Sequence, residues 1–135
     1  MQILVINSGS SSLKFKLFKT GREYSVLANG LVDGIGLTKC KFTYQSPEKH
    51  IGLKLAVKTH SEAIKLALET LKKSKAITNY KEIDAIGHRV VHGGEKYQKP
   101  IKIDVNVIKE IEKLIELAPL HNPANLEGIR TCKKM

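Results

Sequence analysis

The sequence predicts an α/β domain whose mixed sheet begins with antiparallel strands and continues in β-α alternation. Three patterns within its 135 residues support this. Short β-branched runs separated by turn residues fill the first third, apolar residues then recur at helical spacing, and a strand that is apolar on both faces stands between two helical stretches. The length suits one domain, residues 1–135. Because a layered fold would place another strand after the last helix, we expect this domain to be incomplete.

The strands of the first third follow from alternation and turn residues. Gln2 to Ile6 forms a β-branched run that ends in the turn formers Asn7 to Ser12. Apolar residues then alternate with lysines over Leu13 to Leu17, the period of a strand with one buried face. Further strands are expected at Tyr24 to Val32, Lys41 to Gln45 and Ile51 to Val57. Together they predict an antiparallel meander.

A change of period marks the first helix and the strand after it. Thr59 and Glu62 have the spacing of a capping box, and the apolar residues that follow predict a helix to about Lys73. Asp84 to Val91 is apolar on both alternating faces, which predicts a strand buried on two sides. That strand would deliver Arg89 toward its carboxyl end.

Two more helices are expected after a short extended segment at Ile101 to Ile103. Asp104 can cap an amphipathic helix that ends near Pro119. Asn122 is expected to cap the last helix, with Pro123 at its first position, where a missing amide hydrogen costs least.

Composition narrows the class of protein. The chain is 41% hydrophobic and 27% charged, as ordinary globular proteins are. Its net charge of +10 could attract phosphates, but with three Phe, four Tyr and no Trp it is poorly supplied for stacking on bases, and we favour a solvated lysine-rich face. Cys40 and Cys132 have no disulfide or zinc spacing, and no run is long enough to span a membrane. We therefore expect a cytoplasmic protein without a nucleic-acid or membrane partner.

The serine-rich turn after the first strand is the first candidate site. Gly9 and the serines Ser10 to Ser12 present amides and hydroxyls in a small space, and Lys14 adds a positive charge. Such a nest suits phosphate oxygens. It differs from a Walker loop in its spacing and in being followed by a strand. The alternative is an ordinary serine-rich turn.

Arg89 is the second candidate, because it is the only Arg between Arg22 and Arg130. Arg recognises carboxylates and phosphates by two parallel hydrogen bonds, which Lys cannot do. The alternative is an ion pair with Glu95 or Asp84.

Three histidines near these motifs are open to more than one interpretation. His88 and His92 stand four residues apart, but in an extended segment this spacing only weakly favours a metal pair. His121 precedes a helix start, where it could contact an anion or cap the loop.

Three motifs in one order resemble the opening part of the acetate kinase family. They are Val5 to Lys14, Gly87 to Glu95 and Leu117 to Pro123. The resemblance implies reversible phosphoryl transfer from ATP to acetate, with Mg²⁺, giving acetyl phosphate and ADP. It also implies a partial ribonuclease-H-like domain of the actin and sugar-kinase type. Members of the family are much longer, so we expect their C-terminal domain to be absent here.

The resemblance also implies roles for particular residues. Asn7 would lie at the magnesium and phosphate end of the nucleotide. The other groups around the phosphates would be Ser10, Ser12 and Lys14. Arg89 would hold the acetate carboxylate or the transferred phosphoryl group, and His121 would line the active site. A pocket for the acetate methyl group would be formed by Val91 and Leu120.

From this we expect the chain alone to be inactive and to need a C-terminal half, which a second chain could supply. Full-length members of the family are dimers, so the resemblance allows a homodimer, although the dimer contact is built largely from the parts expected to be absent here. The alternatives are a non-catalytic phosphate- or nucleotide-binding or association module, and part of a propionate or butyrate kinase, since one methylene is worth only about 1–3 kcal/mol in a small pocket.

Overall fold

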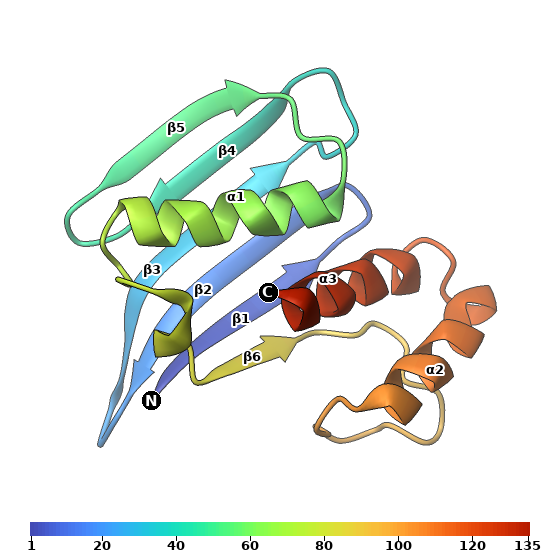
Figure 1. Cartoon of the computed structure of the whole chain (residues 1–135). Coiled ribbons are helices and arrows are strands. Elements are labelled where there is room, and N and C mark those ends of the chain that lie inside the picture. Colours follow the sequence, from blue (N-terminus) through green and yellow to red (C-terminus); the bar gives the residue numbers. More distant parts are fainter.

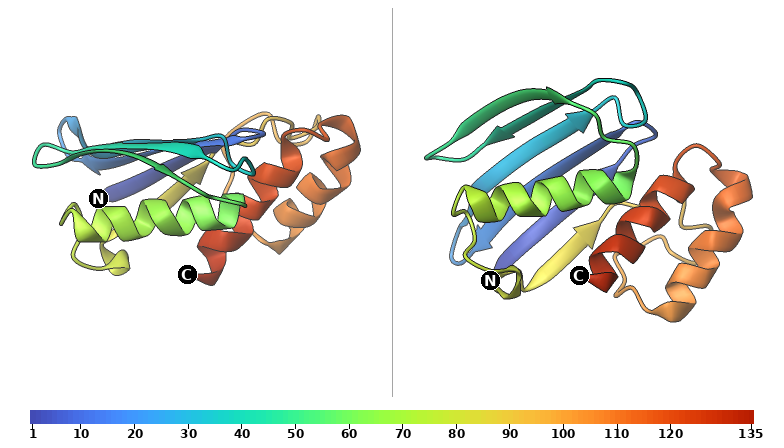
Figure 2. Two further views of the ribbon diagram at one scale, coloured as in Figure 1. Left: turned by 90° about the horizontal axis from the view of Figure 1, so that it is seen from above. Right: turned by 45° about the horizontal axis from the view of Figure 1, so that its top comes forward.

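The computed structural model describes residues 1–135 as one mixed sheet with its helices on a single face (Figures 1 and 2). The five strands of the first third are β1 (Gln2–Ser8), β2 (Ser12–Thr20), β3 (Tyr24–Asp33), β4 (Cys40–Gln45) and β5 (His50–Leu55). The later elements are α1 (His60–Lys73), β6 (Ala85–His88), α2 (Val105–Lys113) and α3 (Asn122–Lys134). Short 3₁₀ turns lie at Tyr80–Glu82 and Leu114–Leu117. No helix is long and apolar enough to cross a membrane.

The sheet has six strands in the order β5-β4-β3-β2-β1-β6. Neighbours from β1 to β5 pair antiparallel, while β6 pairs parallel to β1. The predicted meander and mixed sheet are thus confirmed, and β1, the second strand from one end of the sheet, has one antiparallel and one parallel neighbour. Its carboxyl end therefore lies beside the carboxyl end of β6.

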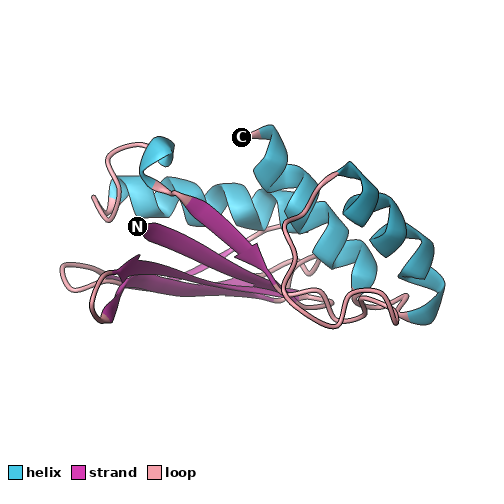
Figure 3. Ribbon diagram, turned by 90° about the horizontal axis from the view of Figure 1, so that it is seen from below, coloured by secondary structure: helices cyan, strands magenta, loops and turns pink.

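The core lies between the sheet and the helix layer (Figure 3). Leu13, Phe15 and Leu17 of β2 are at most 2% exposed, whereas Lys14 and Lys16 between them are exposed. The alternation predicted from the sequence is confirmed, because successive side chains of a strand point to opposite faces. The apolar face of α1 covers the buried side.

Helix α1 begins and ends as predicted. Thr59 is its N-cap, and the Thr59 hydroxyl accepts a hydrogen bond from the Glu62 amide. The Glu62 carboxylate accepts from the Lys58 amide at 2.7 Å, so this second bond reaches one residue further back than a capping box requires. Lys72 and Lys73 lie in the last turn, where their positive charges interact favourably with the negative end of the helix dipole.

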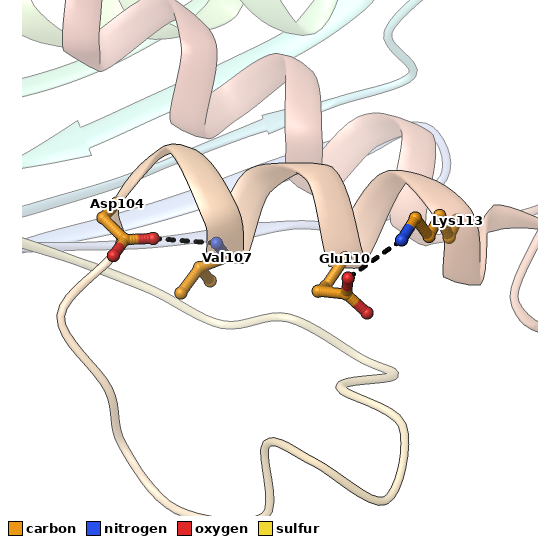
Figure 4. Close-up of polar contacts among 4 residues, drawn as sticks. All are labelled: Asp104, Val107, Glu110 and Lys113. Atoms are coloured by element: carbon orange, nitrogen blue, oxygen red, sulfur yellow. Dashed lines mark hydrogen bonds and ion pairs between the residues drawn. The ribbon is translucent and has the colours of Figure 1, made fainter.

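Helix α2 has the predicted cap and packs on α3. The Asp104 carboxylate accepts from the amides of Asn106 and Val107, and Lys113 donates to Glu110 at 3.0 Å (Figure 4). The hydrogen bond from Lys113 is the largest cause that lowers the pKa of Glu110. Contacts between the two helices form a second small core, made of Val107, Ile111, Leu126 and Ile129.

Three sequence expectations differ from the structure in detail. Helix α2, expected to end near Pro119, ends at Lys113 and is followed by the 3₁₀ turn over Leu114–Leu117. The strand predicted over Asp84 to Val91 is confined to Ala85–His88, and none of its residues is fully buried, although burial on both faces was expected. Its apolar residues are half covered because α3 shields one side only. Helix α3 starts one residue earlier than expected, with His121 as N-cap.

We predict that Gly30→Ala destabilises the fold by about 1–3 kcal/mol, because a Cβ at this position of β3 would collide with the Phe15 ring and approach the Thr43 carbonyl oxygen to 2.9 Å. Gly52→Ala on β5 is the matched control, since no atom lies within 4 Å of its added Cβ. Urea denaturation measures both. Equal stabilities of the two variants would contradict this account of the β2–β3 packing.

Candidate functional site

The serine turn, Gly9 to Ser11, joins β1 to β2. The Gly9 amide donates to the Ser12 carbonyl at 2.8 Å, which closes the turn. A Cβ at position 9 would lie 2.8 Å from the Ser12 hydroxyl oxygen, so glycine permits this close approach. Ser10 and Ser11 are exposed, and Ser12 is half-buried.

Side chains from two helices hold the carbonyl groups at the start of this turn. The Asn125 side-chain amide of α3 donates to the Ser8 carbonyl at 2.8 Å. His60, at the start of α1, approaches the Gly9 carbonyl oxygen with its Nε2 at 2.7 Å. Both side chains are buried, Asn125 to 1% and His60 to 7% exposure. The turn is thereby tied to the helix layer.

The end of the turn is held by the loop after β3. The amides of Gly34 and Ile35 donate to the Ser11 carbonyl at 2.9 and 2.8 Å. By contrast, the amides of Ser10 and Ser11 have no hydrogen-bond partner, and neither do their hydroxyls. The carbonyls of Ser8, Gly9 and Ser11 are thus engaged, while the amides of Ser10 and Ser11 remain free. Free backbone donors of this kind favour an anion.

The end of β6 lies beside this turn. The pairing of Ile6 with His88 continues for one more bond, in which the Arg89 amide donates to the Ile6 carbonyl at 3.1 Å. Arg89 follows the last residue of β6 and lines the space between β6, α2 and α3. Alternation places Ile6 and His88 on the helix-covered face and Asn7 on the opposite face. Lys14 pairs with Asn7 across the hairpin and shares this face.

Arg89 is exposed and forms no ion pair. Asp84, one of the partners considered from the sequence, instead accepts a hydrogen bond from the Gln2 amide at 2.6 Å. The guanidinium is therefore free to meet a carboxylate or phosphate.

Asn125 also connects the turn to the segment after Arg89. Its side-chain oxygen accepts from the Val91 amide at 3.1 Å, while its nitrogen donates to Ser8. Asn122, which is fully buried, holds the next residue of that segment: it donates to the His92 carbonyl at 3.1 Å and accepts from the His92 amide at 3.4 Å. Asn125 thus joins the end of β1 to the segment after Arg89, and Asn122 ties the same segment to α3.

The remaining predicted residues lie near this end but enclose no pocket. Val91 is 43% exposed and Leu120 is 73% exposed. His121 is half-buried at the start of α3 and makes no capping hydrogen bond with its side chain. In the chain as it stands, these side chains form an open surface.

A cleft of about 710 Å³ lies beside β6, between this strand, α2 and α3. Arg89 lines the cleft, and the residues of the serine turn do not. The other cationic side chains along it belong to Lys99, Lys102 and Lys133, and no acidic side chain is present. Arg89 therefore borders a cleft in which the serine turn takes no part.

No group of three or more His, Cys, Asp or Glu residues is placed to hold a metal ion. The ring nitrogen Nδ1 of His92 accepts a hydrogen bond from the Gly94 amide at 3.1 Å, so the lone pair of this nitrogen is not free to bind a metal ion. Asn7 supplies one amide oxygen, which falls short of a protein-built Mg²⁺ site. The residues of this chain do not by themselves make such a site.

Comparison with known proteins identifies the family. The model of the acetokinase family matches residues 2–135. The chain belongs to the acetokinase family. It is 48% identical to the acetate kinase of Thermoanaerobacterium thermosaccharolyticum and 46% identical to that of Thermotoga maritima, in each case over the whole chain and 34% of the relative. The chain thus spans about a third of the length of these relatives. The resemblance seen in the three sequence motifs is confirmed.

Solved structures agree with this assignment. The acetate kinase of Porphyromonas gingivalis superposes with a TM-score of 0.90 at 42% identity, covering 99% of this chain and 34% of that protein. A propionate kinase from Francisella tularensis gives 0.85 at 38% identity, covering 98% of this chain and 33% of that one. The α/β fold class is confirmed as that of acetokinases.

Three residues that hold the serine turn or the segment after Arg89 were not identified in this role from the sequence: His60, Asn122 and Asn125. Asn122 was expected only as a helix cap. Asn125 offered a weak signal, since Asn is a poor helix former in a helix interior and is seldom buried. His60 stands just ahead of the buried Ala63 and Ile64 and could have been recognised as a buried polar group in need of a partner.

We predict that Asn125→Ala destabilises the acetokinase chain by about 2–4 kcal/mol, because the Ser8 carbonyl and the Val91 amide both lose their buried partner. Asn106→Ala is the control, since Asn106 is exposed and its side chain forms no hydrogen bond. Urea denaturation measures the difference. A cost for Asn125→Ala as small as that of the control would show that the link is not stabilising.

His88 predicts a dependence of stability on pH. Burial lowers its pKa from 6.5 to about 4, because the charged form loses its water. The unfolded chain therefore binds this proton more tightly, and the free energy of unfolding falls by about 3 kcal/mol as the pH decreases from above 6.5 to about 4. Chemical denaturation at a series of pH values measures this.

In the variant His88→Asn this part of the pH dependence should disappear, whereas His50→Asn, at an exposed position, should retain it. Parallel profiles for the wild type and His88→Asn would refute the assignment.

Proposed function

We propose that this chain carries the phosphate- and carboxylate-binding part of an acetate kinase. The reaction would be reversible transfer of the γ-phosphoryl group of ATP to acetate, giving acetyl phosphate and ADP. The observation that supports it most is the serine turn, in which the amides of Ser10 and Ser11 are free and which Asn125 links to the segment that begins with Arg89. Family membership supports the same reaction.

The proposed roles follow the chemistry of each group. Ser10 and Ser12 would contact phosphate oxygens through amides and hydroxyls, and Lys14 would add positive charge. Asn7 would lie at the metal-bearing end of the nucleotide, where magnesium held mainly by phosphates and water would neutralise charge. Because this chain supplies too few ligands for Mg²⁺ on its own, the phosphates would have to carry the metal into the site.

Arg89 would bind the acetate carboxylate or the phosphoryl group in transfer, through two parallel hydrogen bonds. Acetate is ionised at neutral pH and needs no base. Its oxygen would form a bond to the γ-phosphorus as the bond from that phosphorus to the bridging oxygen breaks, and ADP would leave with that oxygen. Val91 and Leu120 would contact the methyl group, and His121 would line the site.

Transfer of this kind depends on alignment and on stabilisation of charge in a site that excludes water. Val91, Leu120 and Arg89 are all exposed here. We therefore propose that the chain alone has little or no turnover and acts with the remainder of a family-length protein. A homodimer and a cytoplasmic location, expected from the sequence, stay predictions.

We predict that the purified chain forms no acetyl phosphate from ATP and acetate, and that activity appears when the part of a family-length acetate kinase beyond the matched third is added as a second polypeptide. Formation of acetyl phosphate, trapped as the hydroxamate, measures this. Arg89→Ala should abolish the restored activity by at least about a hundredfold, because a charge-assisted contact to the reacting groups is lost.

Arg22→Ala, at an exposed turn between β2 and β3, is the matched control and should leave the restored rate unchanged. Ordinary turnover by the chain alone, or full activity of Arg89→Ala in the mixture, would contradict the proposal.

A propionate kinase is the second candidate, favoured by the 38% identity to such a protein. Rates with acetate and propionate in the same mixture decide between the two. A binding module without catalysis would instead show a rise in Tm with ATP and no turnover in the mixture.

A further inference from the structure

We propose that His60 is a positioning residue that aims the Ser10 amide at the bound phosphate. This inference rests on the proposed role of the serine turn as a phosphate site. His60 is 7% exposed, and its Nε2 lies 2.7 Å from the Gly9 carbonyl oxygen, 51 residues away along the chain.

The chemistry of the acceptor fixes the proton on the ring. A carbonyl oxygen can only accept, so His60 must carry its hydrogen on Nε2. Protonation of the other nitrogen leaves this donor in place. The contact therefore holds the Gly9 carbonyl in the same position whether or not the second ring nitrogen carries a proton.

Planarity of the peptide bond transmits this contact to the other side of the turn. In a trans peptide the C=O and N–H bonds point in opposite directions within one plane, and no peptide bond of this chain is cis. The Gly9 carbonyl and the Ser10 amide belong to the same plane. Because His60 donates to the Gly9 carbonyl from the side of the helices, the Ser10 N–H points away from the helices. On that side it has no hydrogen-bond partner in the protein.

His60 itself is held in place by the start of α1. Thr59 caps this helix, and the Ser61 amide donates to the Glu127 carboxylate of α3 at 2.9 Å. The buried Ala63 and Ile64 anchor the next turn in the core. The His60 imidazole therefore extends from a well-anchored helix end, and this allows it to fix the orientation of the Gly9–Ser10 peptide group.

NMR spectroscopy of the ¹⁵N-labelled chain tests the inference, with pyrophosphate as the probe. The imidazole nitrogens of wild-type His60 should show the Nε2–H tautomer. The Ser10 amide should shift on addition of pyrophosphate.

His60→Ala should weaken pyrophosphate binding by about five- to tenfold, the worth of one hydrogen bond, and should lower the heteronuclear NOE of Ser10. His60→Gln places an amide nitrogen near the position of Nε2 and should restore binding to within about twofold of the wild type. His50→Gln, at an exposed position on β5, is the control and should change neither measurement.

An Nδ1–H tautomer in the wild type would overturn the inference, and so would wild-type pyrophosphate binding by His60→Ala with an unchanged Ser10 NOE. Failure of the proposed function has a different signature. In that case the wild-type Ser10 amide does not respond to pyrophosphate at all, and the phosphate role of the turn, together with the aim assigned to His60, is wrong.

Discussion

Two hydrogen bonds of one buried amide join the strand ends on which the candidate site depends. Asn125 donates to the Ser8 carbonyl and accepts from the Val91 amide, and it is 1% exposed. Asn125 is too deeply buried for water to replace either bond. Strand pairing supplies no substitute either, because Ser8 is the last residue of β1 and β6 has already ended at His88. The serine turn and the segment carrying Arg89 are therefore coupled through a side chain, although strand pairing alone brings them to the same end of the sheet.

Local patterns were sufficient to predict most of the elements. The alternation of Leu13, Phe15 and Leu17 gave the face of β2, and the spacing of Thr59 and Glu62 gave the start of α1, because burial of a strand or cap depends on residues near in sequence. The motifs around Ser10 and Arg89 likewise pointed to the end of the sheet where the structure places them.

Features that depend on distant parts of the chain were not predictable in this way. The apolar run at Asp84 to Val91 suggested a strand buried on both faces, yet such a run does not reveal whether a layer of helices covers each face. His60 and Asn125 each act on the serine turn from far along the sequence, at separations of 51 and 117 residues. A periodic pattern records which side of a helix is buried, and it does not record which carbonyl lies opposite.

Exposure to water limits how strongly the charged side chains of this surface can bind an anion. Arg89 and Lys14 face water, where a unit charge at 4 Å contributes only about 1 kcal/mol, against several times that in a partly shielded site. The backbone donors of Ser10 and Ser11 are already oriented, so for them no further cost of ordering arises on binding. In the proposed function, this chain would supply the donors of an anion site, while phosphoryl transfer would require a second surface that covers Arg89, Val91 and Leu120. The exclusion of water that the reaction needs would then depend on that second surface, because the residues present here leave the site open.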